Sequence, residues 1–391
     1  MKIGIYLGDI KKPNSYGELT FEHSFIDELI KADVSHEFIF YYFGKKNIFQ
    51  DKEKIKFTCL KQAQRPILPS VKVWQESLNK RLKKDKVNLA IFLTPYLYEH
   101  IEVPYFAIVR DVTHRVLPHF PEFSLNSIFI KREQKFLRFL RGASKIITGN
   151  QIAKDDIRTL YNIIDDNIFL APLPYPVWIE HIEDNPDFLA QNNLTKNSFI
   201  LYPAQFWAHK NHIRLILASQ IMKEQGINLK IVFTGADKGN KNYLINKAQE
   251  LDLANEILFL DYVSHKELAC LYKNAYALVY PSLGGIDSIS ALEAMYFECP
   301  VLISNHPGYN LQLRKAALYF NALDEVDIVK KILNLNDIAL KDDLIAKGKS
   351  LIQENHFRDF IQDILKIADD FYLTRLCWSL EKNYQNKNSL D

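Results

Sequence analysis

The chain has 391 residues, enough for about two domains of roughly 150 residues each. Hydrophobic residues make up 48% of it and charged residues 25%, a balance that is typical of folded globular proteins and excludes a largely disordered chain. The formal net charge of +2 excludes a protein that binds nucleic acid through an overall positive charge.

Charge is nevertheless unevenly distributed along the chain. Residues 41–145 hold 21 Lys and Arg against 9 Asp and Glu, an excess of 12 positive charges, and the rest of the chain is acidic. The densest part is NKRLKKDKVN, residues 79–88. This asymmetry indicates either an anionic partner for the first half, such as a membrane surface, or a basic face that only meets solvent.

The cysteines and the N-terminus indicate a reducing compartment. The opening MKIGIYLGDI has no basic stretch leading into a long apolar core, so we do not expect a signal peptide there. No apolar run reaches the ~18 residues of a membrane span. We expect a cytoplasmic protein that at most rests on the inner face of the cell membrane. The cysteines lack the paired spacing of disulfide frameworks or zinc sites; they are Cys59, Cys270, Cys299 and Cys377.

Apolar runs predict five buried strands in the first half, at residues 2–8, 37–43, 88–94, 105–111 and 144–150. Helical patterns such as LTFEHSFIDELIK and IFIKREQKFLRFL lie between several of them. Near-continuous apolar strands separated by helices are typical of a parallel sheet covered on both faces.

This alternation is interrupted at residues 171–197, where three prolines and then an Asn- and Asp-rich part predict a linker. Beyond it, Ser264 and Glu267 predict a capping box that opens the helix HKELACLYKNA. Five more strands are predicted in this half, at residues 199–203, 229–235, 256–262, 276–282 and 300–305.

The predicted architecture is α/β, with two doubly wound, Rossmann-like units that face a central cleft. Ligands in such sheets bind beyond the carboxyl ends of the strands, so the turns there are the candidate sites. The predicted boundaries are 1–175 for the first unit, 176–197 for the linker, 198–355 for the second unit, and 356–391 for C-terminal helices with a frayed tail.

The stretch PSLGGIDSISALEAMYF, residues 281–297, contains one such turn. Gly284 and Gly285 would let a ligand approach the backbone, and unpaired N–H groups at 288–290 would form an anion site at a helix N-terminus. Glu293 is placed about one turn further on, where it would accept hydrogen bonds from a vicinal diol such as a ribose. The alternative is a tight turn followed by a surface glutamate.

A second strand-to-helix junction is LYPAQFWAHKNH, residues 201–212. Lys210 precedes the helix at a position suited to a phosphate, and Asn211 is placed to cap that helix. Gln205 and Trp207 line the same turn.

Two further features of the second half concern metals and nucleotides. His209 and His212 are three residues apart, but no third ligand lies near them in the sequence, so a metal site is not expected. FTGADKGN, residues 233–240, is a third glycine-bearing turn after a third strand. Three such turns at carboxyl ends in one unit favour a nucleotide cleft.

The first half holds two weaker candidates. Gly17, in NSYGEL, would allow a phosphate to approach the backbone, although the GxGxxG dinucleotide fingerprint is absent. Arg110, Asp111, His114 and Arg115 crowd the end of another strand, where polar clusters usually face a ligand. The alternative is a salt-bridged loop. Neither a nucleophile elbow nor a Ser-His-Asp arrangement is visible.

Several of these motifs resemble, in order and spacing, those of the family 4 retaining glycosyltransferases of the GT-B fold. The resemblance rests on YPAQFWAHKNH, FTGADKGN, YVSHKELACLYKNAYALVYPS and LEAMYFECPVLIS, and it runs from about residue 2 to residue 335. RDVTHRVLPHFPEF followed by KREQ is similar to a subset that builds bacterial surface polysaccharides.

The resemblance implies that the first unit binds the acceptor and the second binds a nucleotide sugar. Lys210 would hold the donor diphosphate with Gln205, which stands where many relatives carry Arg. The residues implied in donor binding are Gly17, Gln205, Lys210, Gly235, Tyr262, Val263, Gly285, Ser288, Ile289 and Glu293. Those implied in catalysis are Lys210, Glu293, Arg110, Asp111 and His114.

The chain departs from the family pattern in three places. The family commonly has two glutamates separated by seven residues, and Gly285 stands where the first would be. Asp287 adds a negative charge near the proposed phosphate, where it would cap the helix or contact sugar hydroxyls. Arg110 stands where many relatives have His or Trp.

The expected reaction is metal-free transfer, with retention, from a UDP- or GDP-sugar to a glycan or lipid-linked saccharide in lipopolysaccharide, capsule or O-antigen synthesis. Positive groups would stabilise the leaving diphosphate, and neither a cofactor nor a nucleic-acid partner is expected. One alternative is a nucleotide-sugar epimerase of the same fold. Another is a catalytically weak homologue that serves as a binding or assembly subunit, which the altered 285–290 tract favours.

Overall fold

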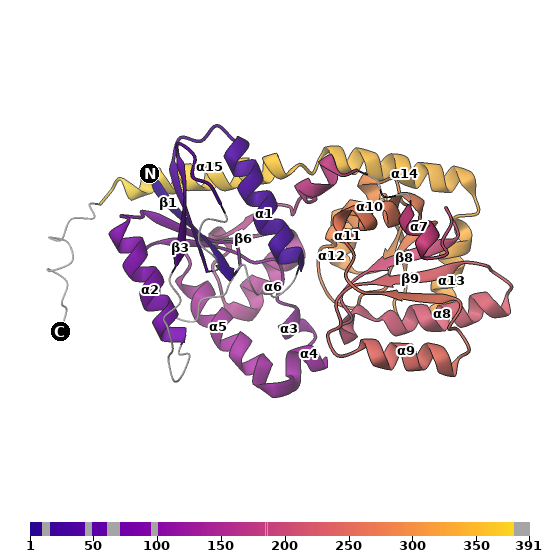
Figure 1. The fold of residues 1–391 in the computed structure, drawn as a ribbon. Helices are drawn as coiled ribbons and strands as arrows, with labels where there is room; N and C mark the ends of the chain where they lie inside the picture. The colour runs from indigo at the N-terminus through magenta and orange to yellow at the C-terminus, as the bar shows by residue number, and fades with distance from the viewer. Residues whose placement is uncertain are drawn as a thin grey trace.

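The computed structural model describes residues 1–9, 16–43, 49–60, 71–94, 101–183, 185 and 187–378. They form two α/β units that lie side by side, each built on one parallel sheet with helices around it (Figure 1). The predicted fold class is confirmed in this arrangement.

In the described part of the first unit, the sheet has seven parallel strands in the order β3-β2-β1-β4-β5-β6-β7. These are β1 Lys2–Asp9, β2 Glu37–Phe43, β3 Ile55–Leu60, β4 Leu89–Phe92, β5 Tyr105–Ile108, β6 Lys145–Thr148 and β7 Ile168–Leu170. The helices are α1 Tyr16–Lys31, α2 Val71–Lys84, α3 Thr113–Val116, α4 Pro121–Ser124, α5 Ile128–Gly142 and α6 Gln151–Tyr161, with the 3-10 turns η1 Leu125–Ser127 and η2 Asp165–Asn167.

The sheet of the second unit has six parallel strands in the order β10-β9-β8-β11-β12-β13. These are β8 Phe199–Pro203, β9 Lys230–Thr234, β10 Ile257–Leu260, β11 Ala277–Tyr280, β12 Val301–Ser304 and β13 Leu318–Phe320. Its helices are α7 Asp187–Gln191, α8 His212–Glu224, α9 Lys241–Glu250, α10 His265–Asn274, α11 Ile289–Tyr296, α12 Pro307–Leu313, α13 Glu325–Asn334 and α14 Ile338–Gln353, with the 3-10 turn η4 Ala208–Lys210.

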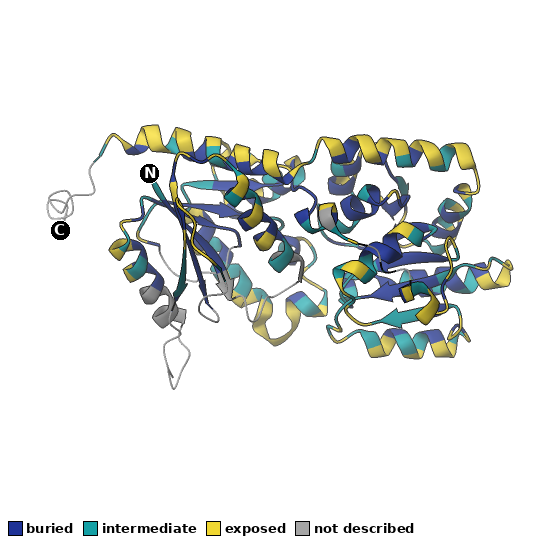
Figure 2. Cartoon of the chain, turned by 45° about the horizontal axis from the view of Figure 1, so that its top comes forward, coloured by how far each residue is buried: buried dark blue, intermediate teal, exposed yellow. Residues whose placement is uncertain are grey.

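The strands are apolar along their length because each sheet packs on both of its faces. In β2, Phe38 and Phe40 belong to one core cluster of the first unit, and Ile39 and Tyr41 belong to another. A strand buried on both faces needs no alternation of polar residues, which is why these runs are recognisable in the sequence. Figure 2 shows the buried strands in both units, with exposed residues along the outer helices.

The chain passes between the units twice, near residues 171–177 and 354–357. The two crossings are joined by a hydrogen bond between the Tyr175 hydroxyl and His356 Nδ1, 2.8 Å long. After the second crossing, α15 Phe357–Arg375 runs along the first unit, where Phe357 and Phe360 pack against Phe21 of α1 (Figure 1).

Two local features differ from the sequence-based expectations, and one agrees. The strands β3, β7 and β13 were not predicted from the sequence. They lie at sheet edges, and their apolar patterns are weak. The segment expected as a linker is not extended throughout: it contains the 3-10 turn η3 Val177–His181 and α7, and Ile179 and Phe188 are buried in the core of the second unit. The predicted capping box of Ser264 and Glu267 is confirmed.

Candidate functional site

The order of the second sheet reverses between β8 and β11, and the turns after these two strands lie next to each other. Lys210, from the turn after β8, donates a hydrogen bond from Nζ to the hydroxyl of Tyr280 at the end of β11, 3.0 Å away. The carbonyl of Lys210 accepts a hydrogen bond from the hydroxyl of Tyr202 on β8 at 2.7 Å, which fixes the turn to the strand that precedes it. The ammonium group of Lys210 is therefore held at the switch point of the sheet, where open α/β sheets bind ligands.

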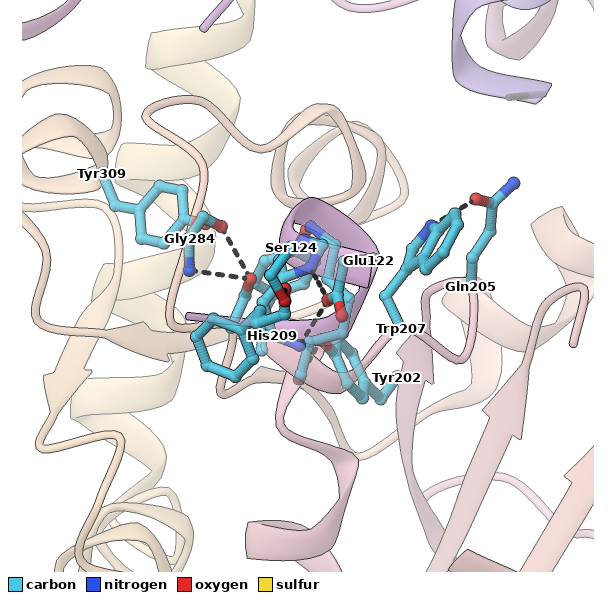
Figure 3. A network of polar contacts seen from close by, with 12 residues as sticks. Glu122, Ser124, Tyr202, Gln205, Trp207, His209, Gly284 and Tyr309 are labelled. Carbon is cyan, nitrogen blue, oxygen red and sulfur yellow. Dashed lines mark hydrogen bonds and ion pairs between the residues drawn. The ribbon is translucent and has the colours of Figure 1, made fainter. Parts of the chain in front are cut away.

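Gln205 lies in the same turn, but its side chain is already engaged. The indole N–H of Trp207 donates to Gln205 Oε1 at 2.9 Å (Figure 3). The carbonyl oxygen is thus occupied, and the amide nitrogen is the end that would serve as a donor to an anion.

The two histidines of this stretch serve separate environments. His212 is fully buried, with its ring 4.6 Å from Tyr202 and 4.9 Å from Phe206, and burial lowers its pKa to about 3. His209 pairs instead with Glu122 of the first unit. Among the described residues, no group of three or more His, Cys, Asp or Glu is placed to hold a metal ion.

Asn211 has a different role from the predicted helix cap. It occupies the position before α8 with a left-handed backbone, φ 57°, and its side chain makes no capping bond. Its amide instead donates to the carbonyls of Pro281, at 3.0 Å, and Ala322, at 2.7 Å. Asn211 therefore ties the turn after β8 to the turn after β11.

The turn after β11 is more enclosed than the sequence suggests. Gly285 has φ +99°, a conformation that favours glycine, but a Cβ on Gly284 would lie 2.7 Å from Leu117 and 2.9 Å from Thr113. Both of these neighbours belong to the first unit. Gly284 therefore permits close contact between the units and does not face an open ligand site, which corrects the expectation drawn from the two glycines.

The start of α11 also differs from expectation. The Ser288 hydroxyl caps the helix by accepting from the Ala291 N–H at 3.2 Å, so the cap is not Asp287. The Ser288 N–H is not unpaired, because it donates to Gln312 Oε1 at 2.8 Å. An anion at this amide would have to displace the Gln312 side chain. Ile289 follows as the first residue of the helix.

Glu293 is buried on the same helix. The residue is only 7% exposed, and the Tyr272 hydroxyl donates to its Oε2 at 2.8 Å. Burial raises the pKa of Glu293 to about 7, although hydrogen bonds from Tyr272 and Trp178 oppose that rise. The carboxyl group is thus poised between its two protonation states near neutral pH and is not the surface glutamate of the alternative interpretation.

The third turn, after β9, holds a glycine that is closed to ligands, and the turn after β10 is more open. A Cβ on Gly235 would lie 2.3 Å from the carbonyl oxygen of Ala204, so glycine is needed there for the close approach of two backbones. Tyr262 and Val263, after β10, are exposed and half-buried respectively. Gly17 lies in the first turn of α1, and its surroundings are outside the part of the chain that the structure describes.

The residues at the end of β5 separate into two groups. Asp111 is partly exposed and accepts a hydrogen bond from the Thr113 N–H at 2.9 Å. Burial alone would raise the pKa of Asp111, but Arg132, the Thr113 hydrogen bond and Arg110 lower it, so the group is an anion at neutral pH.

His114, by contrast, is completely buried, where it contacts Glu133 and the Tyr161 hydroxyl, each at 3.2 Å. Burial and Arg132 lower the pKa of His114 to about 3. A neutral histidine inside the core has no access to substrate, so the structure does not support its predicted catalytic role.

Asp287 lies at the boundary between the units. The Asn150 side chain, from the first unit, donates to Asp287 Oδ1 at 2.9 Å and to the Ile286 carbonyl at 3.1 Å. The other oxygen, Oδ2, is buried and has no hydrogen-bond partner within the described ranges. Burial raises the pKa of Asp287 to about 6; the Asn150 hydrogen bond opposes this, and the charges of Asp111 and Arg110 act in opposite directions.

Some site residues were not identifiable from the sequence. Glu122 of α4 accepts a hydrogen bond from the His209 N–H at 2.8 Å and pairs with His209 Nδ1, as Figure 3 shows. Tyr280 and Asn150 are likewise defined by contacts across the fold. The motif HFPEF gave the only local signal, because it places a lone carboxylate among apolar residues.

Residues 184–349 match the family model described as glycosyl transferases group 1. The chain is 27% identical over 267 residues to the O-antigen chain mannosyltransferase RfbU of Salmonella typhimurium, covering 67% of this chain and 70% of that protein. The chain is a glycosyltransferase. The enzyme class predicted from the sequence is therefore confirmed.

Solved structures show the same fold at low sequence identity. WaaG, described as a glycosyltransferase involved in lipopolysaccharide biosynthesis, superposes on this glycosyltransferase with a TM-score of 0.70 at 14% identity, over 93% of this chain and 99% of WaaG. Anabaena HepE in complex with UDP gives a TM-score of 0.68 at 13% identity, over 95% and 100% of the two chains. Both likenesses show the GT-B fold.

Proposed function

We propose that this glycosyltransferase transfers a sugar, with retention and without a metal, from a UDP- or GDP-sugar to a glycan or lipid-linked saccharide in O-antigen or related surface polysaccharide synthesis. The observation that carries the proposal is the position of Lys210 against Tyr280, at adjacent carboxyl ends of β8 and β11 and inside the region that matches the glycosyltransferase family. RfbU supports the polysaccharide context, and the UDP complex of HepE supports the donor class.

The second unit would bind the donor. Lys210 would contact the diphosphate, where a fixed positive charge stabilises the negative charge that develops as the bond to the sugar breaks. The amide nitrogen of Gln205 would add a neutral donor. The ribose would lie beside Glu293 and the base beside Tyr262 and Val263.

The first unit would supply the acceptor side. Arg110 and Asp111 lie at the end of β5, and their charges influence the pKa of Asp287 across the boundary. Asp287 Oδ2 is buried without a hydrogen-bond partner among the described residues, and it would accept a hydrogen bond from a sugar hydroxyl once the boundary between the units opens. Donor and acceptor would thus meet between the turns after β5 and β11.

A screen for thermal stabilisation by UDP, GDP, ADP and CMP tests the donor assignment. A ligand at 100 times its Kd raises the free energy of unfolding by about 2.7 kcal/mol. We expect stabilisation by UDP or GDP, followed by transfer from the matching sugar nucleotide that survives EDTA. Stabilisation by none of the four, or an absolute need for added divalent metal, would contradict the proposal.

A second candidate function rests on the turn after β11. Gly285 replaces one family glutamate, and Gln312 occupies the Ser288 amide, so the chain could be a binding subunit with little turnover. Donor hydrolysis separates the two: a catalytic enzyme hydrolyses its sugar nucleotide slowly without acceptor, and a binding subunit does not.

The basic surface of α2 would bring the enzyme to an anionic membrane. Lys80, Lys83 and Lys84 are exposed there, although Lys83 pairs with Glu102. Each basic residue near an anionic surface contributes about 1 kcal/mol, and salt screens this attraction. None of the helices in the described ranges is both long enough and apolar enough to cross a bilayer.

Sedimentation with phosphatidylglycerol vesicles at low and high salt tests this surface. We expect salt-sensitive binding that the double variant Lys80→Glu, Lys84→Glu weakens. Equal binding to anionic and neutral vesicles at low salt would leave this surface without a membrane role.

A further inference from the structure

A short segment of the first unit reaches across the boundary and docks on the turns that hold Lys210. This segment, residues 113–124, contains α3 and α4, which lie next to the second unit in Figure 1. Thr113 and Leu117 occupy the space that a side chain at position 284 would need, and Phe123 packs 5.2 Å from the His209 ring. A side chain at position 284 would push against the side-chain ends of Leu117 and Thr113, so the contact leaves little room on the Gly284 side.

Glu122 is the polar centre of this contact. Its side chain is 4% exposed, and it accepts hydrogen bonds from both the backbone N–H and the imidazole of His209. Burial alone would raise the pKa of Glu122, but the bonds from His209 lower it, and burial lowers the pKa of His209. An ionised carboxylate thus accepts from a neutral imidazole that carries its proton on Nδ1.

His209 links Glu122 to both turns of the proposed donor site. It immediately precedes Lys210, and its carbonyl accepts a hydrogen bond from the Leu283 N–H at 2.9 Å. Gly284, the next residue, is fixed in turn by hydrogen bonds to its carbonyl from Ser282, at 2.7 Å, and Tyr309, at 2.9 Å. Figure 3 shows Glu122, His209 and Gly284 as neighbouring parts of one network.

We propose that Glu122 is a positioning residue which, through His209, holds the turns around Lys210 and Gly284 in the arrangement that binds the donor diphosphate. This inference rests on the proposed function and extends it: the donor site of the second unit is complete only when the segment 113–124 of the first unit is docked on it. Loss of the Glu122 carboxylate leaves the His209 N–H buried without an acceptor, so the docked arrangement becomes less favourable while the core of each unit is untouched.

The test measures binding of a nucleoside diphosphate to the full chain by calorimetry. The probe is UDP or GDP, whichever stabilises the wild type, and the reference ligand is the corresponding nucleoside monophosphate, UMP or GMP. We expect Glu122→Ala to weaken diphosphate binding about tenfold and monophosphate binding by less than about threefold. Glu122→Gln keeps an acceptor for His209 and should stay within about threefold of wild type for both ligands.

Ser124→Ala is the matched control, because the Ser124 hydroxyl bonds only within the first unit in the described contacts, to the Phe120 carbonyl at 3.0 Å. It should leave both affinities unchanged. Equal diphosphate affinity in wild type and Glu122→Ala would overturn the inference and leave the proposed function standing. Equal losses for the two ligands, or the same loss in Ser124→Ala, would also overturn it. A wild type that binds neither UDP nor GDP would overturn both.

Discussion

The turns after β8 and β11 and the segment after β5 border the same boundary but are built differently. Lys210 is held by Tyr202 and Tyr280, both from its own sheet. The segment 113–124 is held at its far end by His209, which belongs to the other unit. The second unit thus holds its proposed donor-binding lysine with residues of its own sheet, whereas the segment of the first unit is positioned by contact with the other unit. Substitutions in the two regions should therefore fail in different ways.

The largest effect is expected in the second unit. Lys210→Ala should lower the rate of transfer by ~10²-fold or more with the fold intact, because a charged group is lost from the leaving diphosphate. Steady-state kinetics with the preferred sugar nucleotide measures this loss. Lys223→Ala, on the exposed face of the following helix, is the control and should behave as wild type. Wild-type turnover in Lys210→Ala would refute its assignment.

The next effect concerns stability and pH. Burial raises the pKa of Glu293 from 4.5 to about 7, so ionising this carboxyl costs free energy in the folded state. The protonated Glu293 therefore contributes to the free energy of unfolding. This contribution is fully present below pH 4.5 and is lost as pH rises through 7. The glutamine of Glu293→Gln cannot ionise, so the variant does not lose this stability. The free energy of unfolding of the variant minus that of the wild type should therefore increase between pH 5 and pH 8, on the order of 2–3 kcal/mol. Urea unfolding at both pH values measures it, and a constant difference would show that Glu293 ionises normally.

The same residue gives a smaller effect on binding. A hydrogen bond to a charged group is worth about 1.5–3 kcal/mol, so Glu293→Gln should weaken binding of a ribonucleotide at least about tenfold at pH 8. A 2′,3′-dideoxy analogue lacks the diol and should be affected much less. Glu298→Gln, an exposed carboxylate just beyond the same helix, provides the control. Equal losses for both nucleotides would mean that Glu293 does not hold the ribose.

The smallest effect on activity is expected in the region that the sequence analysis assigned to catalysis. His114→Gln should change kcat/KM by less than about threefold, because the side chain is buried away from any substrate. It should still lower the free energy of unfolding by about 1–3 kcal/mol through lost packing and hydrogen bonds. Asp111→Asn, on the partly exposed side of the same motif, should reduce transfer more. A severe kinetic defect in a stably folded His114→Gln would reverse this distinction.

These contrasts explain what could be predicted from the sequence. The long apolar strands could be predicted because both of their faces are buried. The position of Lys210 could be predicted because a strand, a turn and a helix follow one another locally in the sequence. Glu122 and Asn150 were missed because their partners lie 87 and 136–137 residues away along the chain. The burial of His114 and of Gly284 was missed for the same reason, since neighbours from distant segments decide it.

The hydrogen bond between Tyr175 and His356 has a mechanical consequence. It joins the two covalent connections between the units at one place, which makes that place the natural pivot for a rotation of one unit against the other. In Figure 1 the connections lie at the top of the boundary and α4 lies at its lower end, so Glu122 acts at the free end of a lever. A contact far from the pivot opposes rotation with a long lever arm, and a substitution at Tyr175 should change how the two units turn against each other without altering the contact of Glu122 with His209.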